Sequence, residues 1–448
     1  LKSRFSGPQS TKRVFYLRVR HRCEERDQMS IFRSLKGALG GEGAHQADEV
    51  EREHMESVKK ALAYGDVETR WNAIRAAGEL GDAFIEPLVN ALDDEHWIIR
   101  RGAGETLAKI GLPAVPPLIE VLGTEDESVR QEAMRACVLI GGPAVESLTR
   151  ALSRDNPAIR RGAAEILGEM QAQSASAPLI EALKDSDPGV RREAAAALKM
   201  LGAEEAISPL ISLLGDESGY VRIAAAEALC SMGGKSIAPL VAALAHPQPE
   251  IRQRSALALA SIGTLAVEPL ISALSHDDPL VRQGAAGVLG RIRDPRAIPG
   301  LIGVLGDRER NVRQEAVRAL ALLGNPAITP LVAAFREGDV VVRNCTMEAL
   351  WIIGEPATRP LLELLSDQNA EVRRRTALLL GEIGDPAAVD GLTRLLADPV
   401  PSVRREGFEA LEKVRKKQGE GLRAIPQPPR QPDQEPEKPA KGKKSGTW

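Results

Sequence analysis

Aromatic residues are scarce in this sequence, where they account for 3% of 448 residues against 43% for all apolar residues. A hydrophobic core must therefore be built from Ala, Leu, Ile and Val, which suits helices that stack closely and regularly. The sequence contains no run of 18 or more consecutive apolar residues, so we expect no membrane-spanning helix. No segment has the charged start, apolar centre and small-residue cleavage site of a secretory signal.

Cysteine and histidine are also few. The four cysteines, Cys23, Cys137, Cys230 and Cys345, lie far apart and form no Cys-x-x-Cys pair, which argues against a disulfide framework or a zinc site. The six histidines are scattered, and no pairing of a nucleophile with a base is evident. The sequence therefore predicts no metal, cofactor or assignable catalytic residue, and a reducing cytoplasmic location.

The net charge of −3 is unevenly distributed. Residues 1–28 carry eight Lys or Arg and three Asp or Glu, and residues 415–448 carry nine and four, so each end has a net charge of +5. The segment between them therefore carries −13. Nucleic-acid binding, which needs a basic surface, ranks low for such a chain.

A two-helix unit of about 30 residues recurs along most of the chain. In Pro178–Gly202, PLIEALKDSDPGVRREAAAALKMLG, apolar residues spaced three and four apart mark two helices, and Lys-Asp-Ser-Asp-Pro-Gly marks the turn. The second helix starts at an apolar residue and an arginine, and it ends in a Gly that Gln171, Arg293 and Arg415 replace in three repeats. The arginine recurs every 30 or 31 residues, at Arg70, Arg100, Arg130, Arg160, Arg191, Arg222, Arg252, Arg282, Arg313, Arg343, Arg373 and Arg404. This period predicts an all-α, right-handed solenoid of about twelve repeats.

Three regions follow from this pattern. Residues 1–52 are expected to be a poorly ordered extension with a short amphipathic helix near 30–40 and a flexible link over 40–48. Residues 53–417 form the repeats, and residues 418–448, rich in Pro and Lys, are expected to be disordered. Because the sequence starts with Leu, one hypothesis is that translation begins at Met29.

The recurring arginine sits where the helix dipole disfavours a cation, so it needs a partner. Acidic residues precede it by four to six positions in most repeats. We therefore expect a structural Asp–Arg ladder along one edge, in which Asp caps the second helix and binds an arginine of its own or the adjacent repeat. The turn before Arg252 contains His246 and no Asp, so the ladder should be weakest there. Its aspartates are Asp94, Asp126, Asp155, Asp187, Asp216, Asp278, Asp307, Asp339, Asp367 and Asp398.

The repeat, PLIxxLxDxDPxVRxxAAxALGxIG, resembles the HEAT-like repeats of the phycobilisome (bilin) lyase type, most plainly in 384–411, 269–290 and 360–384. The resemblance implies the solenoid fold, and its functions range from scaffolds to bilin lyase subunits. Deoxyhypusine hydroxylases, which are also helical-repeat proteins, hold two irons with His-Glu pairs, and no His-Glu dipeptide occurs here. His246 and His276 occupy equivalent turns without a carboxylate pattern to complete a metal site.

A partner groove is expected on the second helices, where positions one, two, five and nine after the arginine should face outward. These positions are charged in the early repeats and less polar later. Trp351 stands eight positions after its arginine, where most repeats have a small residue; it either fills space beside Ala321 and Gly381 or anchors a partner. The candidate groove residues are Ile223, Arg254, Leu257, Arg291, Arg318, Leu322, Trp351, Ile352 and Leu378.

These features favour a monomeric, non-enzymatic scaffold that holds another protein or peptide in its groove. The alternative is a bilin-lyase-like or chaperone-like subunit that acts on a tetrapyrrole protein. Nucleic-acid binding is the third possibility.

Overall fold

The structure is a computed structural model and describes residues 42–418. Within this range every regular element is a helix and no strand occurs, as the sequence predicted. The chain divides into two compact units, Leu1–Ser231 (unit 1) and Met232–Trp448 (unit 2).

Each unit repeats one pair of helices, a first helix followed by a second helix, six times within the described residues, and the second helix is the longer one in every pair except α3–α4. In unit 1 the first helices are α3 (Glu42–Tyr64), α5 (Ile85–Asn90), α7 (Val115–Val121), α9 (Val145–Ala151), α11 (Ser176–Ala182) and α13 (Ile207–Leu213). The second helices are α4 (Val67–Leu80), α6 (Trp97–Ile110), α8 (Glu127–Ile140), α10 (Pro157–Glu169), α12 (Pro188–Leu201) and α14 (Gly219–Ser231).

Unit 2 has the same organisation. Its first helices are α15 (Gly234–Ala242), α17 (Val267–Ala273), α19 (Ile298–Gly303), α21 (Asn325–Glu337), α23 (Thr358–Leu364) and α25 (Val389–Leu395). Its second helices are α16 (Pro249–Ile262), α18 (Pro279–Ile292), α20 (Arg310–Leu323), α22 (Val340–Ile353), α24 (Ala370–Ile383) and α26 (Pro401–Lys417). Short 3-10 turns join many of them: η1 (Gly81–Phe84), η2 (Ala91–Asp93), η3 (Leu112–Ala114), η4 (Gly142–Ala144), η5 (Gln173–Ala175), η6 (Glu204–Ala206), η7 (Ala243–Ala245), η8 (Gly263–Ala266), η9 (Pro295–Ala297), η10 (Val304–Gly306), η11 (Glu355–Ala357) and η12 (Pro386–Ala388).

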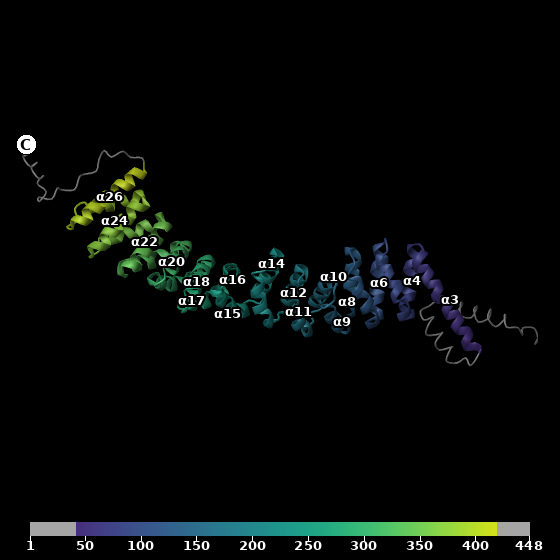
Figure 1. Cartoon of the computed structure of the whole chain (residues 1–448). Coiled ribbons are helices and arrows are strands. Elements are labelled where there is room, and N and C mark those ends of the chain that lie inside the picture. The colour runs from purple at the N-terminus through teal and green to yellow at the C-terminus, as the bar shows by residue number, and fades with distance from the viewer. Residues whose placement is uncertain (1–41, 419–448) are drawn as a thin grey trace, which may run out of the picture. The chain divides into compact units, whose positions relative to one another are not determined.

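Helices pack mainly against their neighbours in the chain. Within each unit a second helix contacts its own first helix and the second helix of the next repeat, as the labels along each unit in Figure 1 illustrate. The core between the two layers is aliphatic: in α12, Val190, Ala194 and Leu198 are fully buried, and Leu179 of α11 is buried against the same layer. Each unit is therefore an α-solenoid, whose stability comes from the stacking of neighbouring repeats.

Second helices end where the sequence predicted. The nine terminal glycines all have positive φ, for example +73° at Gly81 and +63° at Gly202, a conformation that side chains disfavour. Two of the three residues that replace this glycine, Gln171 and Arg293, also have positive φ, of 50° and 59°, whereas Arg415 lies inside α26. The helix-ending geometry is therefore kept in those two repeats despite its cost to a residue with a side chain.

The N-terminal boundary differs from the expectation. Helix α3 is continuous from Glu42 to Tyr64, so residues 42–48, expected to be a flexible link, are helical, and the predicted start of the repeats at residue 53 lies inside this helix. It packs on α4 as the first helix of a repeat, which explains why it persists. The predicted helix near 30–40, the hypothesis concerning Met29 and the predicted tail beyond Gln418 lie outside the described residues.

One stretch in the described range, Pro249–Ala273, is long and apolar enough to cross a membrane, with a mean hydropathy of 1.6. In the structure this stretch is α16, η8 and α17, and Gly263 with φ of +74° separates the two α-helices. The apolar composition therefore belongs to two consecutive helices of the solenoid, one ending a repeat and one starting the next.

Candidate partner-binding site

The arginine near the start of each second helix folds back onto the preceding turn. In α12, Nη1 of Arg191 donates to the backbone carbonyls of Asp185 (2.8 Å) and Ser186 (3.1 Å). These carbonyls follow the C-terminal end of α11, where a cation is favourable, so the bonds offset the position of Arg191 at the N-terminus of α12. The same bond to the carbonyl six residues earlier is made by Arg100, Arg130, Arg160, Arg222, Arg252, Arg282, Arg313, Arg373 and Arg404.

In some repeats the opposite edge of the guanidinium binds an aspartate of the next repeat. We call each such Arg–Asp ion pair a rung of the ladder. In unit 2, Nε of Arg282 lies 2.7 Å from Oδ2 of Asp307, and Nη2 lies 2.9 Å from Oδ1. This hydrogen bond raises the pKa of Arg282 and lowers the pKa of Asp307. Each rung uses the aspartate six positions before the next arginine: Arg70–Asp94 (3.0 Å), Arg160–Asp185 (2.7 Å), Arg191–Asp216 (2.8 Å), Arg282–Asp307 (2.7 Å) and Arg373–Asp398 (2.7 Å).

The ladder is interrupted, unlike the continuous series that the sequence suggested. Arg100, Arg130 and Arg313 form no rung, because the sixth position before the following arginine is Thr124, Arg154 or Glu337. Asp367 pairs with Arg336 (2.7 Å), while Arg343 donates to the carbonyl of Phe335 (3.1 Å). Asp155 offers its backbone carbonyl to Arg160 (2.8 Å). The ladder is thus limited to some of the repeats, and only Arg160–Asp185 and Arg191–Asp216 are rungs in consecutive repeats of the described residues.

A second class of aspartate caps the helices. Asp126 accepts from the backbone amides of Ser128 (2.8 Å) and Val129 (3.2 Å) at the start of α8. Asp187, Asp278 and Asp339 cap α12, α18 and α22 in the same way. The sequence suggested that one aspartate would both cap a helix and bind arginine. The structure divides the two tasks between positions four and six before the arginine.

Two histidines replace the rung aspartate in unit 2. Nδ1 of His246 accepts from the amide of Gln248 (3.2 Å), and Nδ1 of His276 accepts from the amide of Asp278 (3.0 Å). The aspartate oxygens do the same elsewhere, as when Oδ1 of Asp307 accepts from the amide of Glu309 (2.8 Å). The imidazoles therefore keep the turn but supply no carboxylate to an arginine of the preceding repeat.

Several of the predicted groove residues present apolar side chains to solvent. In unit 1, Ile223 is 58% exposed, and in unit 2 the exposed fractions are 48% for Leu257, 45% for Leu322 and 49% for Ile352. Leu378 is only half-buried. Of the basic candidates, Arg291 and Arg318 are exposed and Arg254 is half-buried. The second helices of unit 2 therefore carry a row of solvent-facing aliphatic side chains with arginines among them.

Trp351 is also exposed, at 53% of its surface. At the equivalent position α24 has Gly381, where an added Cβ would lie 2.8 Å from Cα of Ala410 in α26. Gly381 thus lets α26 approach α24 closely, whereas α22 makes much less contact with α24. About half of the Trp351 side chain is therefore available at the surface, and both interpretations, filling space beside Ala321 and Gly381 or anchoring a partner, stay predictions.

Thiol and carboxylate chemistry offers little here. Burial raises the pKa of the Cys137 thiol to about 12, and burial also raises the pKa of Cys230 and Cys345, so these thiols are poor nucleophiles. In unit 1, burial and then the nearby Glu193 raise the pKa of Glu165. Within residues 42–418 no group of three or more His, Cys, Asp or Glu side chains is placed to hold a metal ion.

Overlapping segments covering residues 55–425 match the HEAT repeats family: 55–137, 85–166, 145–230, 207–268, 237–310, 267–351, 298–366 and 358–425. The chain belongs to the HEAT-repeat family. Its helix pairs are HEAT repeats, and solenoids of this kind are typical scaffolds for protein interactions.

Individual relatives are more distant. Deoxyhypusine hydroxylase of Rattus norvegicus is 47% identical over 55 residues, which are 12% of this chain and 18% of that protein. The complex of CpcE and CpcF of phycocyanin lyase from Nostoc sp. is 25% identical, with 52% of this chain and 93% of that chain covered and a TM-score of 0.26. Importin beta is 14% identical, with 92% and 71% covered and a TM-score of 0.33. The HEAT-repeat assignment rests on the family match, and the bilin lyase type stays a proposal.

Proposed function

We propose that this HEAT-repeat protein is a non-enzymatic scaffold that binds a partner protein on the second helices of unit 2. The observation that carries the proposal is the exposed apolar row of Leu257, Leu322, Trp351 and Ile352, whose exposed fractions lie between 45% and 53%. Large apolar groups that recur on one set of helices characterise protein-binding surfaces. Tryptophan is one of the residues enriched at the energetic centre of such interfaces.

The chemistry of the chain supports a protein partner over the other classes. The net charge of −13 outside the two ends disfavours nucleic acid. The short match to deoxyhypusine hydroxylase is not accompanied by any His-Glu dipeptide in the sequence, so we do not propose hydroxylation. We further propose that the protein acts as a monomer in the cytoplasm, which light scattering and cell fractionation would test.

The alternative, a bilin-lyase-like or chaperone-like subunit that acts on a tetrapyrrole protein, is favoured by the repeat pattern of residues 269–290 and 384–411. The two proposals differ in what accompanies the protein. A scaffold retains a protein without pigment, whereas the alternative requires a chromophore that absorbs visible light.

Capture from native extract with the full chain as bait tests the proposal. The variants Trp351→Ala and Ile352→Ala should weaken retention of the captured protein, about 30-fold if Trp351 contributes about 2 kcal/mol. Leu265→Ala is the matched control, because Leu265 is 66% exposed in unit 2 but lies on η8, outside the row. Equal retention by all three variants would refute the proposed surface. Co-purified pigment would support the alternative, and salt-sensitive retention of DNA would support nucleic-acid binding.

A further inference from the structure

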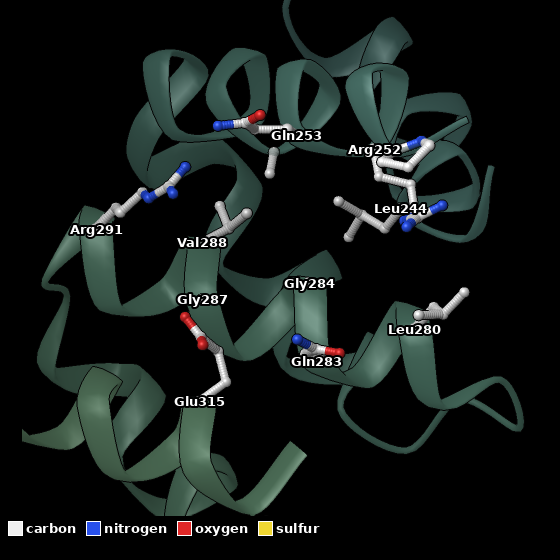
Figure 2. A pocket seen from close by; sticks show the side chains of 12 residues that line it. Leu244, Arg252, Gln253, Leu280, Gln283, Gly284, Gly287, Val288, Arg291 and Glu315 are labelled. Atoms are coloured by element: carbon white, nitrogen blue, oxygen red, sulfur yellow. The ribbon is translucent and has the colours of Figure 1, made fainter. Parts of the chain in front are cut away.

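A pocket of about 270 Å³ opens between α16 and α18 in unit 2 (Figure 2). Its apolar wall includes Leu244, which is 2% exposed, and Val288, which is fully buried. Its polar lining consists of two arginines, two amides and one carboxylate: Arg252, Arg291, Gln253, Gln283 and Glu315. Figure 2 shows Arg252 and Arg291 on opposite sides of the pocket.

The pocket lies where the ladder is broken. Arg252 donates through Nη1 to the carbonyls of His246 (2.8 Å) and Pro247 (2.9 Å), as the other ladder arginines do with their own turns. The next repeat has His276 at the rung position, so Nε and Nη2 of Arg252 lack the carboxylate that Arg282 obtains from Asp307. Arg252 forms no ion pair within residues 42–418, and two strong hydrogen-bond donors are left for another acceptor.

The side chain of the second arginine of the pocket, Arg291, also lacks a partner within the described residues. Arg291 is exposed near the end of α18 and has no hydrogen bond or ion pair in the part of the chain that the structure describes. The single acidic residue in the lining is Glu315, and it pairs with Arg318 at 3.2 Å. The ionisable side chains that line the pocket, Arg252, Arg291 and Glu315, therefore sum to +1 within an acidic protein.

Two glycines of α18, Gly284 and Gly287, line this pocket. An added Cβ at Gly287 would lie 2.9 Å from Oε1 of Glu315, and one at Gly284 would lie 3.1 Å from side-chain carbons of Leu244. The glycines therefore let Leu244 and Glu315 pack closely against the α18 backbone beside the pocket.

We propose that this pocket binds an acidic segment of the partner protein, with one carboxylate at Arg252 and another at Arg291. The inference rests on the proposed function and specifies the chemistry of the partner. Guanidinium groups bind carboxylates through paired, charge-assisted hydrogen bonds, as the five rungs of the ladder already do in this protein. The partner thus supplies the carboxylates that the chain itself omits, while Gln253 and Gln283 offer amide donors to its backbone.

The probe is a fluorescent hexaglutamate peptide, and its anisotropy is followed on titration with the full chain at low salt. Arg291→Gln removes one guanidinium that has no structural contact, and Gln253→Glu places a repelling charge at the pocket. Each should weaken binding roughly tenfold to a hundredfold, because charge-assisted hydrogen bonds are lost or opposed. Arg310→Gln is the matched control, because it makes the same charge change as Arg291→Gln at an exposed residue that does not line the pocket, and it should leave affinity within about twofold.

Four results would overturn the inference: no binding of hexaglutamate, equal binding of hexaglutamine, equal effects of Arg291→Gln and Arg310→Gln, or binding of free glutarate as tight as that of the peptide. Melting curves of all variants verify that they are folded. The proposed function is tested separately, because capture that depends on Trp351 but not on Arg291 keeps the scaffold and removes the acidic-segment site. Capture that does not depend on Trp351 removes the proposed surface of the scaffold itself.

Discussion

Removal of a rung from the ladder should destabilise the chain more than removal of an arginine that has no rung. The variant Arg282→Met deletes the guanidinium that binds Asp307 while it keeps an unbranched side chain for packing. Both partners are only 8% exposed, and the two bonds measure 2.7 and 2.9 Å. Asp307 would be left as a buried carboxylate without its cation, which is where the cost arises.

The destabilisation caused by Arg282→Met has two parts, loss of the bonds to backbone carbonyls and loss of the rung. One control variant measures the first part alone. Arg313→Met removes an arginine of the next second helix, whose Nη1 donates to the carbonyls of Asp307 (2.6 Å) and Arg308 (3.1 Å) but which has no rung. Loss of such carbonyl bonds to a charged donor should cost about 1.5–3 kcal/mol. Loss of one partner of a buried pair costs about 3–5 kcal/mol, so Arg282→Met should exceed Arg313→Met by about 2 kcal/mol.

The assay is hydrogen exchange followed by mass spectrometry, because it resolves the local opening of individual helices, whereas an unfolding midpoint reports on the repeat array as a whole. Amides of α18 and α20 should lose protection in Arg282→Met, with a smaller effect in Arg313→Met. Asp307→Asn, which removes the charge but keeps an oxygen for the amide of Glu309, should lie between them. If Arg282→Met and Arg313→Met proved equal, the rungs would contribute nothing beyond the carbonyl bonds and the reasoning would fail.

Three further predictions concern acid, spacing and helix ends. Since Arg282 lowers the pKa of Asp307, the rung contributes stability above the unfolded pKa of about 4. The urea midpoint should therefore stay constant from pH 7 to 5 and fall below pH 4, and less steeply in Asp307→Asn. Gly290→Val should cost about 1–3 kcal/mol in thermal unfolding, because an added Cβ would lie 2.7 Å from Cα of Ala319; Gly303→Ala, with no atom within 4 Å of the added Cβ, is the control. Arg293→Gly should raise the melting temperature by relieving a positive φ of 59°, a gain of about 1 kcal/mol, and a decrease would contradict this.

The fold could be predicted from the sequence because its signals are local and repeated. An apolar-Arg pair, a turn containing Asp and Pro, and a terminal Gly each act within about thirty residues, and a position that is unclear in one repeat is clear in the others. Even the exceptions carried information: Gln171 and Arg293, which replace the terminal glycine, adopt its positive φ. The start of α3 at Glu42 was missed because α3 is a first helix, whereas the recurring arginine and the terminal glycine mark second helices.

The contacts of the ladder were harder to predict from the sequence than the fold. The sequence showed aspartates near each arginine, but whether an aspartate caps its own helix or binds the preceding repeat depends on two positions of register. Asp187 caps α12, whereas Asp185 binds Arg160. The carbonyl bonds of the arginines left no signal, because backbone acceptors are present in every sequence. The absence of Asp near His246 did mark this part of the chain as unusual, although it could not reveal a pocket.

The surface of unit 2 is distinguished by residues that differ from the usual residue at their position in the repeat. A position that holds a small residue in most repeats contributes to the stacking of helices. Gly381 is an example, because its lack of a side chain lets Ala410 pack closely against it. A residue that abandons this role without being buried has lost a stacking contact, and Trp351 at 53% exposure is such a residue. His276 likewise gives up a rung, and Arg252 then lines a pocket without a carboxylate partner in residues 42–418. A partner that covers Trp351 and neutralises Arg252 would restore both kinds of contact, which is why the binding site and the irregular repeats should coincide.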